Sequence, residues 1–162
     1  MTQSLFPAHT HNHDACRKDA LANAQRHLAA SKARLTPDRQ AVLEVLLDSH
    51  RAQGAYDIME QIDWRGRRPA PAVIYRALDF LVSHGLVHKI ESLNAFMACP
   101  HADHAHKPMI MICRDCTQVA EFEAPGIGRA ISKVAKDTGF VTDQTTVEVT
   151  GQCGTCAARG AA

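Results

Sequence analysis

Two Cys-x-x-Cys pairs in the C-terminal third of the chain are the residues whose type and spacing most clearly indicate chemistry. The first pair is Cys113 with Cys116, and the second is Cys153 with Cys156. Four thiolates in two such pairs can close a tetrahedron around one zinc ion. We therefore predict a four-cysteine structural zinc site. In so short a segment, the bound ion would supply folding free energy that a small core lacks.

A second set of possible metal ligands lies between the two halves of the chain. It combines imidazole, thiol and carboxylate groups, all of which bind zinc. Its members are His88, Cys99, His101, His104, His106 and Glu121. A lone histidine is usually a surface residue, so the clustering is what favours metal binding. A free cysteine such as Cys99 can also be a small buried hydrophobic residue at a strand end.

The composition limits what can position these ligands. With 162 residues, 46% of them hydrophobic, and a net charge of +1, the chain can bury two small cores. No apolar run is long enough to cross a bilayer, and residues 1–14 lack the basic start and apolar stretch of a secretory signal. We expect a cytoplasmic protein without a membrane partner. In that reducing compartment, paired cysteines are more often metal ligands or redox centres than disulfides.

Helical signals dominate residues 15–92, which follow a polar, histidine-containing tail that we expect to be disordered. The pattern predicts a helix from near residue 14, and a second that begins at Thr36-Pro37. A third runs from Ala55 to about residue 64, and a fourth opens at Pro71 and stops before Gly85. In the fourth helix we predict one buried stripe at helical spacing, made of Ile74, Leu78, Leu81 and Val82.

Residues 86–90 and 95–98 then predict a pair of short strands. Helices followed by a hairpin describe a winged helix-turn-helix, whose last helix enters the major groove of DNA, so that Tyr75 and Arg76 would face the bases. An ordinary helical bundle with the same exposed residues is the alternative. A basic group before this helix suits phosphate contact, although a solvated loop has the same composition. The group comprises Arg65, Arg67 and Arg68.

Residues 108–162 have a different character and predict a small α/β unit after a ligand-rich hinge at residues 93–107. Strands should flank the first cysteine pair, and a further strand should lead to the second. Between them, residues 125–140 predict a helix with one apolar face, formed by Ile127, Ile131, Val134 and Ala135. The exposed edges of so small a sheet suggest pairing with a second copy. The fold class is therefore α+β.

Several stretches, taken in order from about residue 15 to 157, resemble the ferric uptake regulator family. They are TPDR, AYDIM, PAVIYRALDFL followed by HGLVHKIES, a Cys/His-rich hinge, CRDC and a late CGTC. Within the family, the chain is most similar to the zinc uptake regulators. The resemblance implies a homodimeric winged-helix repressor that binds inverted-repeat operator DNA when zinc is bound and represses zinc-uptake genes. It implies neither an enzyme nor a small-molecule substrate.

The resemblance also assigns residues to these roles. Two zinc ions per subunit would be held by a regulatory site and a structural site. The regulatory ligands would be His88, Cys99, His106 and Glu121, and the structural ligands Cys113, Cys116, Cys153 and Cys156. Tyr75 and Arg76, with Tyr56 on the preceding helix, would read DNA. The extra His101 and His104 are possible additional ligands, and leave open whether His104 or His106 completes the regulatory site.

Other functions remain as alternatives. The same scaffold could sense iron, manganese, nickel or peroxide, although the thiol of Cys99 makes a softer site that favours zinc. A zinc store or metallochaperone that does not bind DNA would use the same ligands. A zinc-dependent deaminase would need His-x-Glu and Pro-Cys-x-x-Cys, whereas Asp103 and Ile112 stand at those positions. A thiol oxidoreductase would place a single Cys-x-x-Cys pair at the start of a helix that follows a strand, and the two pairs of this chain speak against it.

Overall fold

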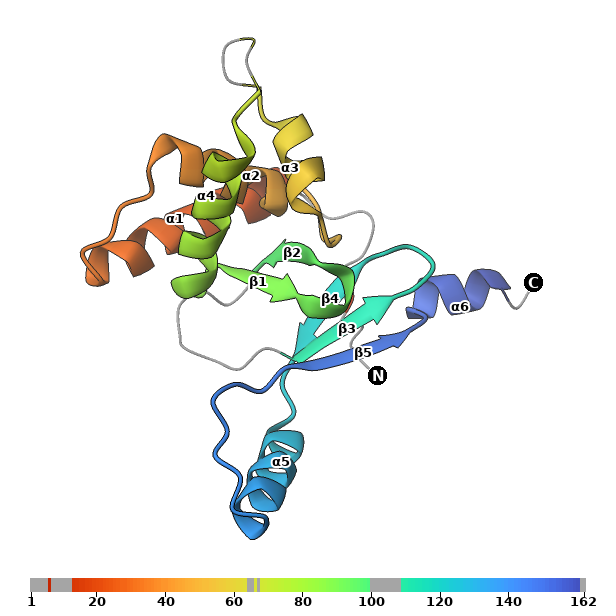
Figure 1. Ribbon diagram of the computed structural model, residues 1–162. Helices are drawn as coiled ribbons and strands as arrows, with labels where there is room; N and C mark the ends of the chain where they lie inside the picture. Colours follow the sequence, from red (N-terminus) through yellow and green to blue (C-terminus); the bar gives the residue numbers. More distant parts are fainter. Residues whose placement is uncertain (1–5, 7–12, 64–65, 67, 100–108, 161–162) are drawn as a thin grey trace.

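The computed structural model describes residue 6 and residues 13–63, 66, 68–99 and 109–160. A bundle of helices lies above a two-stranded hairpin, and the hairpin lies beside a three-stranded sheet (Figure 1). None of the helices within these ranges has the length and apolar character needed to span a membrane.

Four helices form the N-terminal unit. They are α1 (His13–Ala30), α2 (Pro37–Leu47), α3 (Ala55–Gln61) and α4 (Pro71–Ser83). Proline occupies the first turn of α2 and of α4, where its fixed φ suits the helix and its missing N–H has no partner to lose. Thr36 is the N-cap residue of α2, as predicted, but its hydroxyl makes no capping hydrogen bond. Gly85 follows α4 with φ of 68°, the left-handed conformation that ends a helix.

The core of this unit lies between the helices and one face of the hairpin. Three residues of the predicted stripe on α4 are almost fully buried, namely Ile74, Leu78 and Leu81. The prediction for Val82 is wrong, because 37% of this residue is exposed. At 3.6 residues per turn, Val82 lies about 80° around the helix from Ile74 and therefore at the edge of the stripe.

The hairpin consists of β1 (Val87–Ile90), a single 3₁₀ turn η1 (Glu91–Leu93), and β2 (Ala95–Ala98). The strands are antiparallel, with Val87 opposite Ala98. Gln53 exchanges two backbone hydrogen bonds with Phe96, so the segment before α3 also lines the hairpin. Helices and hairpin together form the predicted winged helix-turn-helix.

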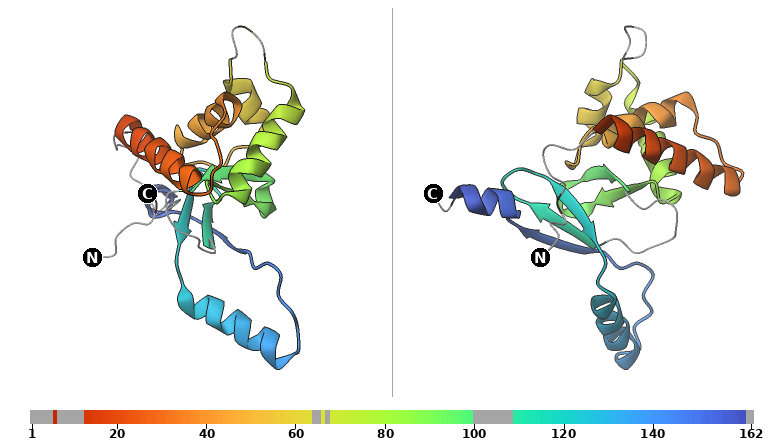
Figure 2. Two further views of the ribbon diagram at one scale, coloured as in Figure 1. Left: turned by 90° about the vertical axis from the view of Figure 1, so that its left-hand side faces the viewer. Right: turned by 180° about the vertical axis from the view of Figure 1, so that it is seen from behind.

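The C-terminal unit contains a three-stranded sheet in the order β4-β3-β5. Its strands are β3 (Met109–Cys113), β4 (Val119–Phe122) and β5 (Val147–Gly151). Strand β3 is antiparallel to β4 and parallel to β5. Helix α5 (Pro125–Asp137) connects β4 to β5 and projects away from the sheet in every view (Figures 1 and 2). A short helix, α6 (Gly154–Gly160), was not predicted.

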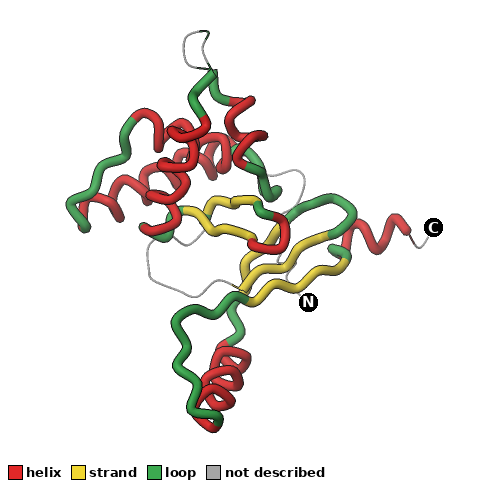
Figure 3. Tube along the Cα trace, viewed as in Figure 1, coloured by secondary structure: helices red, strands yellow, loops and turns green. Residues whose placement is uncertain are grey.

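The two units are joined where the hairpin meets the sheet (Figure 3). A second apolar cluster brings Ile90 and Met97 of the hairpin against Ile110, Ile112 and Val119 of the sheet. The backbone also crosses this boundary, because the N–H of Val119 donates to the carbonyl of His50 over 3.0 Å. The hairpin is thus packed between the helices and the sheet, and any change in its position moves one unit relative to the other.

Candidate metal centres

The structure brings the four cysteines of the two pairs together, and we call this group the cysteine cluster. Its members are Cys113, Cys116, Cys153 and Cys156, whose Sγ atoms all lie within 4.8 Å of one another. The Sγ atoms of Cys116 and Cys153 are 3.8 Å apart. A tetrahedral zinc ion with Zn–S bonds of about 2.3 Å separates its sulfur ligands by about 3.8 Å. The cluster therefore fits a zinc ion with small adjustments.

The sheet explains how residues so distant in sequence meet. Cys113 ends β3 opposite Gly151 on the parallel strand β5, so the chain that leaves β5 passes beside it. The N–H of Cys153 then points at the Cys113 sulfur, at 3.3 Å. On the other side, the turn from β3 to β4 includes Thr117 in a left-handed conformation, with φ of 58°, which reverses the chain and places Cys116 beside its partners.

The pKa values of these thiols differ although the groups are adjacent. Burial alone would raise the pKa of Cys113, but N–H donors from the backbone of Cys153, Cys116 and Asp115 outweigh it and lower the pKa from 9.0 to about 6. Burial raises the pKa of Cys116. The hydrogen bond with Cys153, together with burial, raises the pKa of Cys156 to about 12. Without metal, one thiol of the cluster is therefore readily ionised and two resist ionisation.

Three of the predicted regulatory ligands also lie together, and we call them the sensor cluster. It consists of His88, Cys99 and Glu121, with one ligand atom of each within 4.8 Å of the others. Nε2 of His88 lies 3.4 Å from Oε2 of Glu121, and Sγ of Cys99 lies 3.9 Å from the same oxygen. The side chains of His88 and Glu121 are 9% and 3% exposed, and Cys99 is buried. His106, His101 and His104 lie outside the described residues.

Strand register accounts for the sensor cluster. His88 pairs with Met97, and the N–H of Cys99 donates to the carbonyl of Leu86. Residues two apart on a strand share a face, so His88 and Cys99 lie on the same face of the hairpin. Glu121 comes from β4 of the facing sheet. The cluster therefore spans the boundary between the units, with two ligands from one unit and one from the other.

The donor set of the sensor cluster fits zinc. Tetrahedral nitrogen and oxygen ligands of zinc lie about 3.3 Å apart, close to the separation of His88 and Glu121. A thiolate is a soft ligand that suits zinc better than ferrous or manganous ions. Bringing an imidazole, a thiol and a carboxylate into one buried place is unfavourable unless they are paired or bind a cation. The three residues can thus supply three ligands of one metal site.

The predicted DNA-contacting residues lie on the helical unit, away from both clusters. Tyr56 on α3 and Tyr75 on α4 are 64% and 43% exposed, and both lie where the two helices meet. Arg76 is exposed, and its Nε donates to the carbonyl of Ala72 on its own helix, at 3.1 Å. Arg68 is exposed, and its Nη1 lies 3.9 Å from Oε1 of Glu60. Arg65 and Arg67 lie outside the described residues.

Two residues at the boundary of the units have no role in the sequence-based prediction. Gln118 is buried and forms a β-bridge to Arg51 of the helical unit, directly after the first cysteine pair. Glu148 on β5 contacts the tip of the hairpin. A lone polar residue in a strand pattern carries no signal for such long-range contacts. The only available signals were that Gln118 follows the first cysteine pair and that Glu148 lies within a predicted strand.

Known proteins share both the sequence pattern and the architecture of this chain. The zinc uptake regulation protein of Escherichia coli is 34% identical over 140 residues, which is 86% of this chain and 82% of that protein. A zinc uptake regulator solved with zinc and DNA has a TM-score of 0.86 at 33% identity, over 90% of this chain and 98% of that one. The holo form of XcZur has a TM-score of 0.78 at 36% identity, over 88% and 99%.

One relative of lower identity is a regulator of another kind. The peroxide operon regulator of Bacillus subtilis is 28% identical over 138 residues, covering 84% of this chain and 92% of that protein. The model of the ferric uptake regulator family matches residues 30–150, which include the α2–α4 helices, the hairpin, the sensor cluster and all but the last residue of the three-stranded sheet. This chain therefore belongs to the ferric uptake regulator family, whose members are metal-responsive transcriptional regulators and not enzymes.

Proposed function

We propose that this protein is a zinc-responsive transcriptional repressor whose zinc-bound homodimer binds inverted-repeat operator DNA and represses zinc-uptake genes. The observation that carries the proposal is the sensor cluster. It gathers a thiol, an imidazole and a carboxylate from both units within 4.8 Å. The similarity to zinc uptake regulators, one of them solved with zinc and DNA, supports the same assignment.

Two zinc ions per subunit would have different tasks. The cysteine cluster lies wholly within the C-terminal unit, so an ion there would hold that unit together. An ion at the sensor cluster would instead tie the hairpin to the sheet. We assign the fourth sensor ligand to His106, with His104 as the alternative in the same segment, as the family resemblance implies.

The chain's own residues explain how such a tie could affect DNA binding. His88 and Cys99 belong to the hairpin, whose other face packs on the helical bundle through Val87 and Phe96. Glu121 belongs to the sheet. Fixing the hairpin on the sheet therefore fixes the helical unit as well, and with it the orientation of α4. A ligand that favours one arrangement over others increases the population of that arrangement.

The DNA surface would be formed by α3, α4 and the loop between them. In a winged helix-turn-helix, the N-terminal part of the last helix contacts base edges. Tyr75 and Arg76 occupy that part of α4, and Tyr56 stands beside them on α3. Arg68, with Arg65 and Arg67, would contact phosphates. Arginine can pair with guanine through two hydrogen bonds, which makes Arg76 the candidate for reading sequence.

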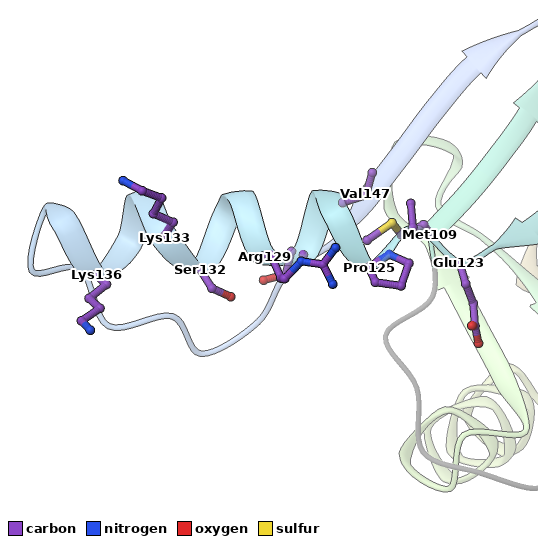
Figure 4. Close-up of a pocket in the computed structure, with 11 residues that line it drawn as sticks. Met109, Glu123, Pro125, Arg129, Ser132, Lys133, Lys136 and Val147 are labelled. Carbon is purple, nitrogen blue, oxygen red and sulfur yellow. The ribbon is translucent and has the colours of Figure 1, made fainter.

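A homodimer would be formed by the C-terminal unit. Helix α5 buries none of its residues within one chain, and 63% of Val134 is exposed. After the helix, 68% of Phe140 is exposed as well. The side chains of Arg129, Ser132, Lys133 and Lys136, which are labelled in Figure 4, line a separate pocket along α5. Exposed apolar side chains such as Val134 and Phe140 on a projecting segment are typical of an interface, and a second copy would bury them.

A titration of DNA with protein at buffered metal concentrations tests this proposal. Duplexes selected from a random pool by the zinc-loaded protein serve as the probe. Zinc should increase affinity for the selected duplex over a scrambled one, whereas iron and manganese at their own buffered concentrations should not. Response to iron or manganese alone would reassign the metal. Indifference to every metal would exclude the regulator and favour a zinc store.

A further inference from the structure

A carboxylate from the sheet holds the tip of the hairpin. Glu148 on β5 accepts a hydrogen bond from the backbone N–H of Glu91 at 2.7 Å and another from the N–H of Ser92 at 3.1 Å. These two N–H groups open η1, and the first N–H groups of a helical turn have no partner within it. Glu148 therefore supplies acceptors that the hairpin itself lacks.

These hydrogen bonds involve the charged form of the carboxylate. Burial alone would raise the pKa of Glu148, but the side chain of Ser92 and the backbone N–H groups of Glu91 and Ser92 outweigh it and lower the pKa. Hydrogen bonds to an ionised acceptor are roughly twice as strong as those between neutral groups. The contact is therefore present in full at neutral pH.

The register of the sheet places this contact in line with the sensor cluster. Ile110 on β3 pairs with Glu121 on one side and with Glu148 on the other. Residues opposite one another in neighbouring strands share a face, so these three side chains form one row. Glu121 meets His88, and Ile110 packs in the same apolar cluster as Ile90. Glu148 completes the row at the hairpin tip.

We propose that Glu148 is a second anchor of the hairpin, a positioning residue that acts together with the sensor cluster to set the arrangement of the two units that binds zinc and DNA. The expected effect of Glu148 on DNA binding rests on the proposed function. The expected effect of Glu148 on the metal site does not, because the anchor and the sensor cluster fix the same hairpin on the same sheet.

The two contacts should therefore be energetically coupled. With the tip held by Glu148, His88 and Cys99 already lie close to Glu121, and an entering zinc ion has less freedom to remove. With the tip released, zinc must itself pay for orienting the hairpin. Linkage requires the converse too, so zinc binding should stabilise the hydrogen bonds made by Glu148.

Three variants of the 162-residue chain, loaded with zinc at the cysteine cluster, test the anchor. Glu148→Ala removes both acceptors, and Glu148→Gln keeps one side-chain oxygen. Asp143→Ala is the control, because it removes the same charge from an exposed residue in the segment before β5. The measurements are zinc affinity of the sensor cluster, by competition with a chelator, and hydrogen exchange of the Glu91 and Ser92 amides.

Glu148→Ala should weaken zinc binding at the sensor cluster about tenfold, within the range typical of coupled sites, and should expose both amides to exchange. Glu148→Gln should give an intermediate loss, and Asp143→Ala should give none. A merely structural residue would change melting temperature without this graded effect on zinc. Unchanged zinc affinity in Glu148→Ala, or in Glu148→Gln if the alanine variant does not fold, would overturn the anchor.

The failure of the anchor is distinguishable from the failure of the proposed function. Loss of amide protection and of zinc affinity in Glu148→Ala would support the anchor even if the wild-type protein bound no DNA. Conversely, zinc-dependent DNA binding by the wild-type protein, with zinc affinity unchanged in both Glu148 variants, would leave the repressor standing and remove the anchor.

Discussion

At the scale of single residues, the thiol of Cys99 decides the chemistry of the sensor cluster. His88 and Glu121 alone could belong to a site for several divalent metals, because imidazole and carboxylate accept many of them. A thiolate added to this pair gives a softer site. Cys99 is also buried at the end of β2, so the alternative interpretation of Cys99 as a small buried hydrophobic residue is compatible with the structure as well.

Replacement of Cys99 by serine tests the ligand assignment without DNA. The hydroxyl stays protonated at neutral pH and is a poor zinc ligand, so zinc affinity at the sensor cluster should fall by about tenfold or more. The cysteine cluster should keep its ion, and at a buffered free zinc concentration that only just saturates the wild-type protein, the bound zinc should fall from two ions per chain toward one. An unchanged second zinc in Cys99→Ser would show that Cys99 is not a ligand.

Zinc binding to the cysteine cluster should release protons. Cys156, with a pKa raised to about 12, and Cys116, with a raised pKa, carry protons at neutral pH in the metal-free protein. Zinc binds thiolates, so those protons must leave, and affinity should fall as pH falls. The fall should steepen below pH about 6, where Cys113 also gains a proton.

Calorimetric zinc titrations in two buffers of different ionisation enthalpy measure this release. They are best made in the Cys99→Ser background, which removes the thiol of the sensor cluster from the count. Proton release that is the same at every pH would contradict the different pKa values of the cluster.

At the scale of elements, local signals predicted the starts of α2 and α4 and the end of α4 well, whereas α3 and α5 end about three residues before the predicted positions. Pro37 and Pro71 start α2 and α4, and Gly85 ends α4, because their φ preferences act within one or two residues. The predicted stripe on α4 was right for its centre and wrong for Val82. Periodicity identifies the middle of an apolar face, whereas the packing of neighbouring helices determines how wide that face is.

A pair of truncations on α4 tests this packing. Leu78→Ala should reduce the free energy of unfolding by about 2–5 kcal/mol, because Leu78 is fully buried and leaves a cavity. Val82→Ala removes apolar atoms from an exposed edge and should change the free energy of unfolding by less than about 1 kcal/mol. Urea unfolding of the two variants checks this, and equal losses would contradict the described burial.

What the sequence did not predict depends on contacts between distant segments. The cysteine spacing indicated the cysteine cluster, but α6, which carries Cys156, is a seven-residue helix with a glycine at each end, too short to show a helical period. The contact of Glu148 with the hairpin tip requires the register of β3 with both neighbours. The sensor cluster was predictable as a set of ligand types, whereas its position across the boundary of the units required the fold.

At the scale of the whole molecule, the hairpin would connect the metal site to the DNA-binding surface in the proposed function. One face packs on the helices that would contact DNA, and the other carries the sensor cluster and faces the sheet. The projecting helix α5 then leaves apolar surface for a second copy. Two copies would present two α4 helices, and an operator with inverted repeats has the matching symmetry.

A charge on α5 tests the dimer. Val134→Asp should weaken dimerisation at least about tenfold, because an unpaired carboxylate would be buried in the interface. It should leave the fold of each chain intact, since Val134 is exposed within one chain. Ala22→Asp adds the same charge to an exposed site on α1 and serves as the control. Sedimentation that shows the same dimer in all three proteins would place the interface elsewhere.

The most direct test of the account compares the wild-type protein with Cys99→Ser in binding a selected duplex across a range of buffered free zinc, with the cysteine cluster loaded throughout. The wild-type protein should gain about 5- to 150-fold in affinity over one zinc transition, the range typical of coupled sites. In Cys99→Ser, this transition should shift to higher zinc or disappear. Identical zinc dependence in both proteins would contradict the claim that the sensor cluster controls DNA binding.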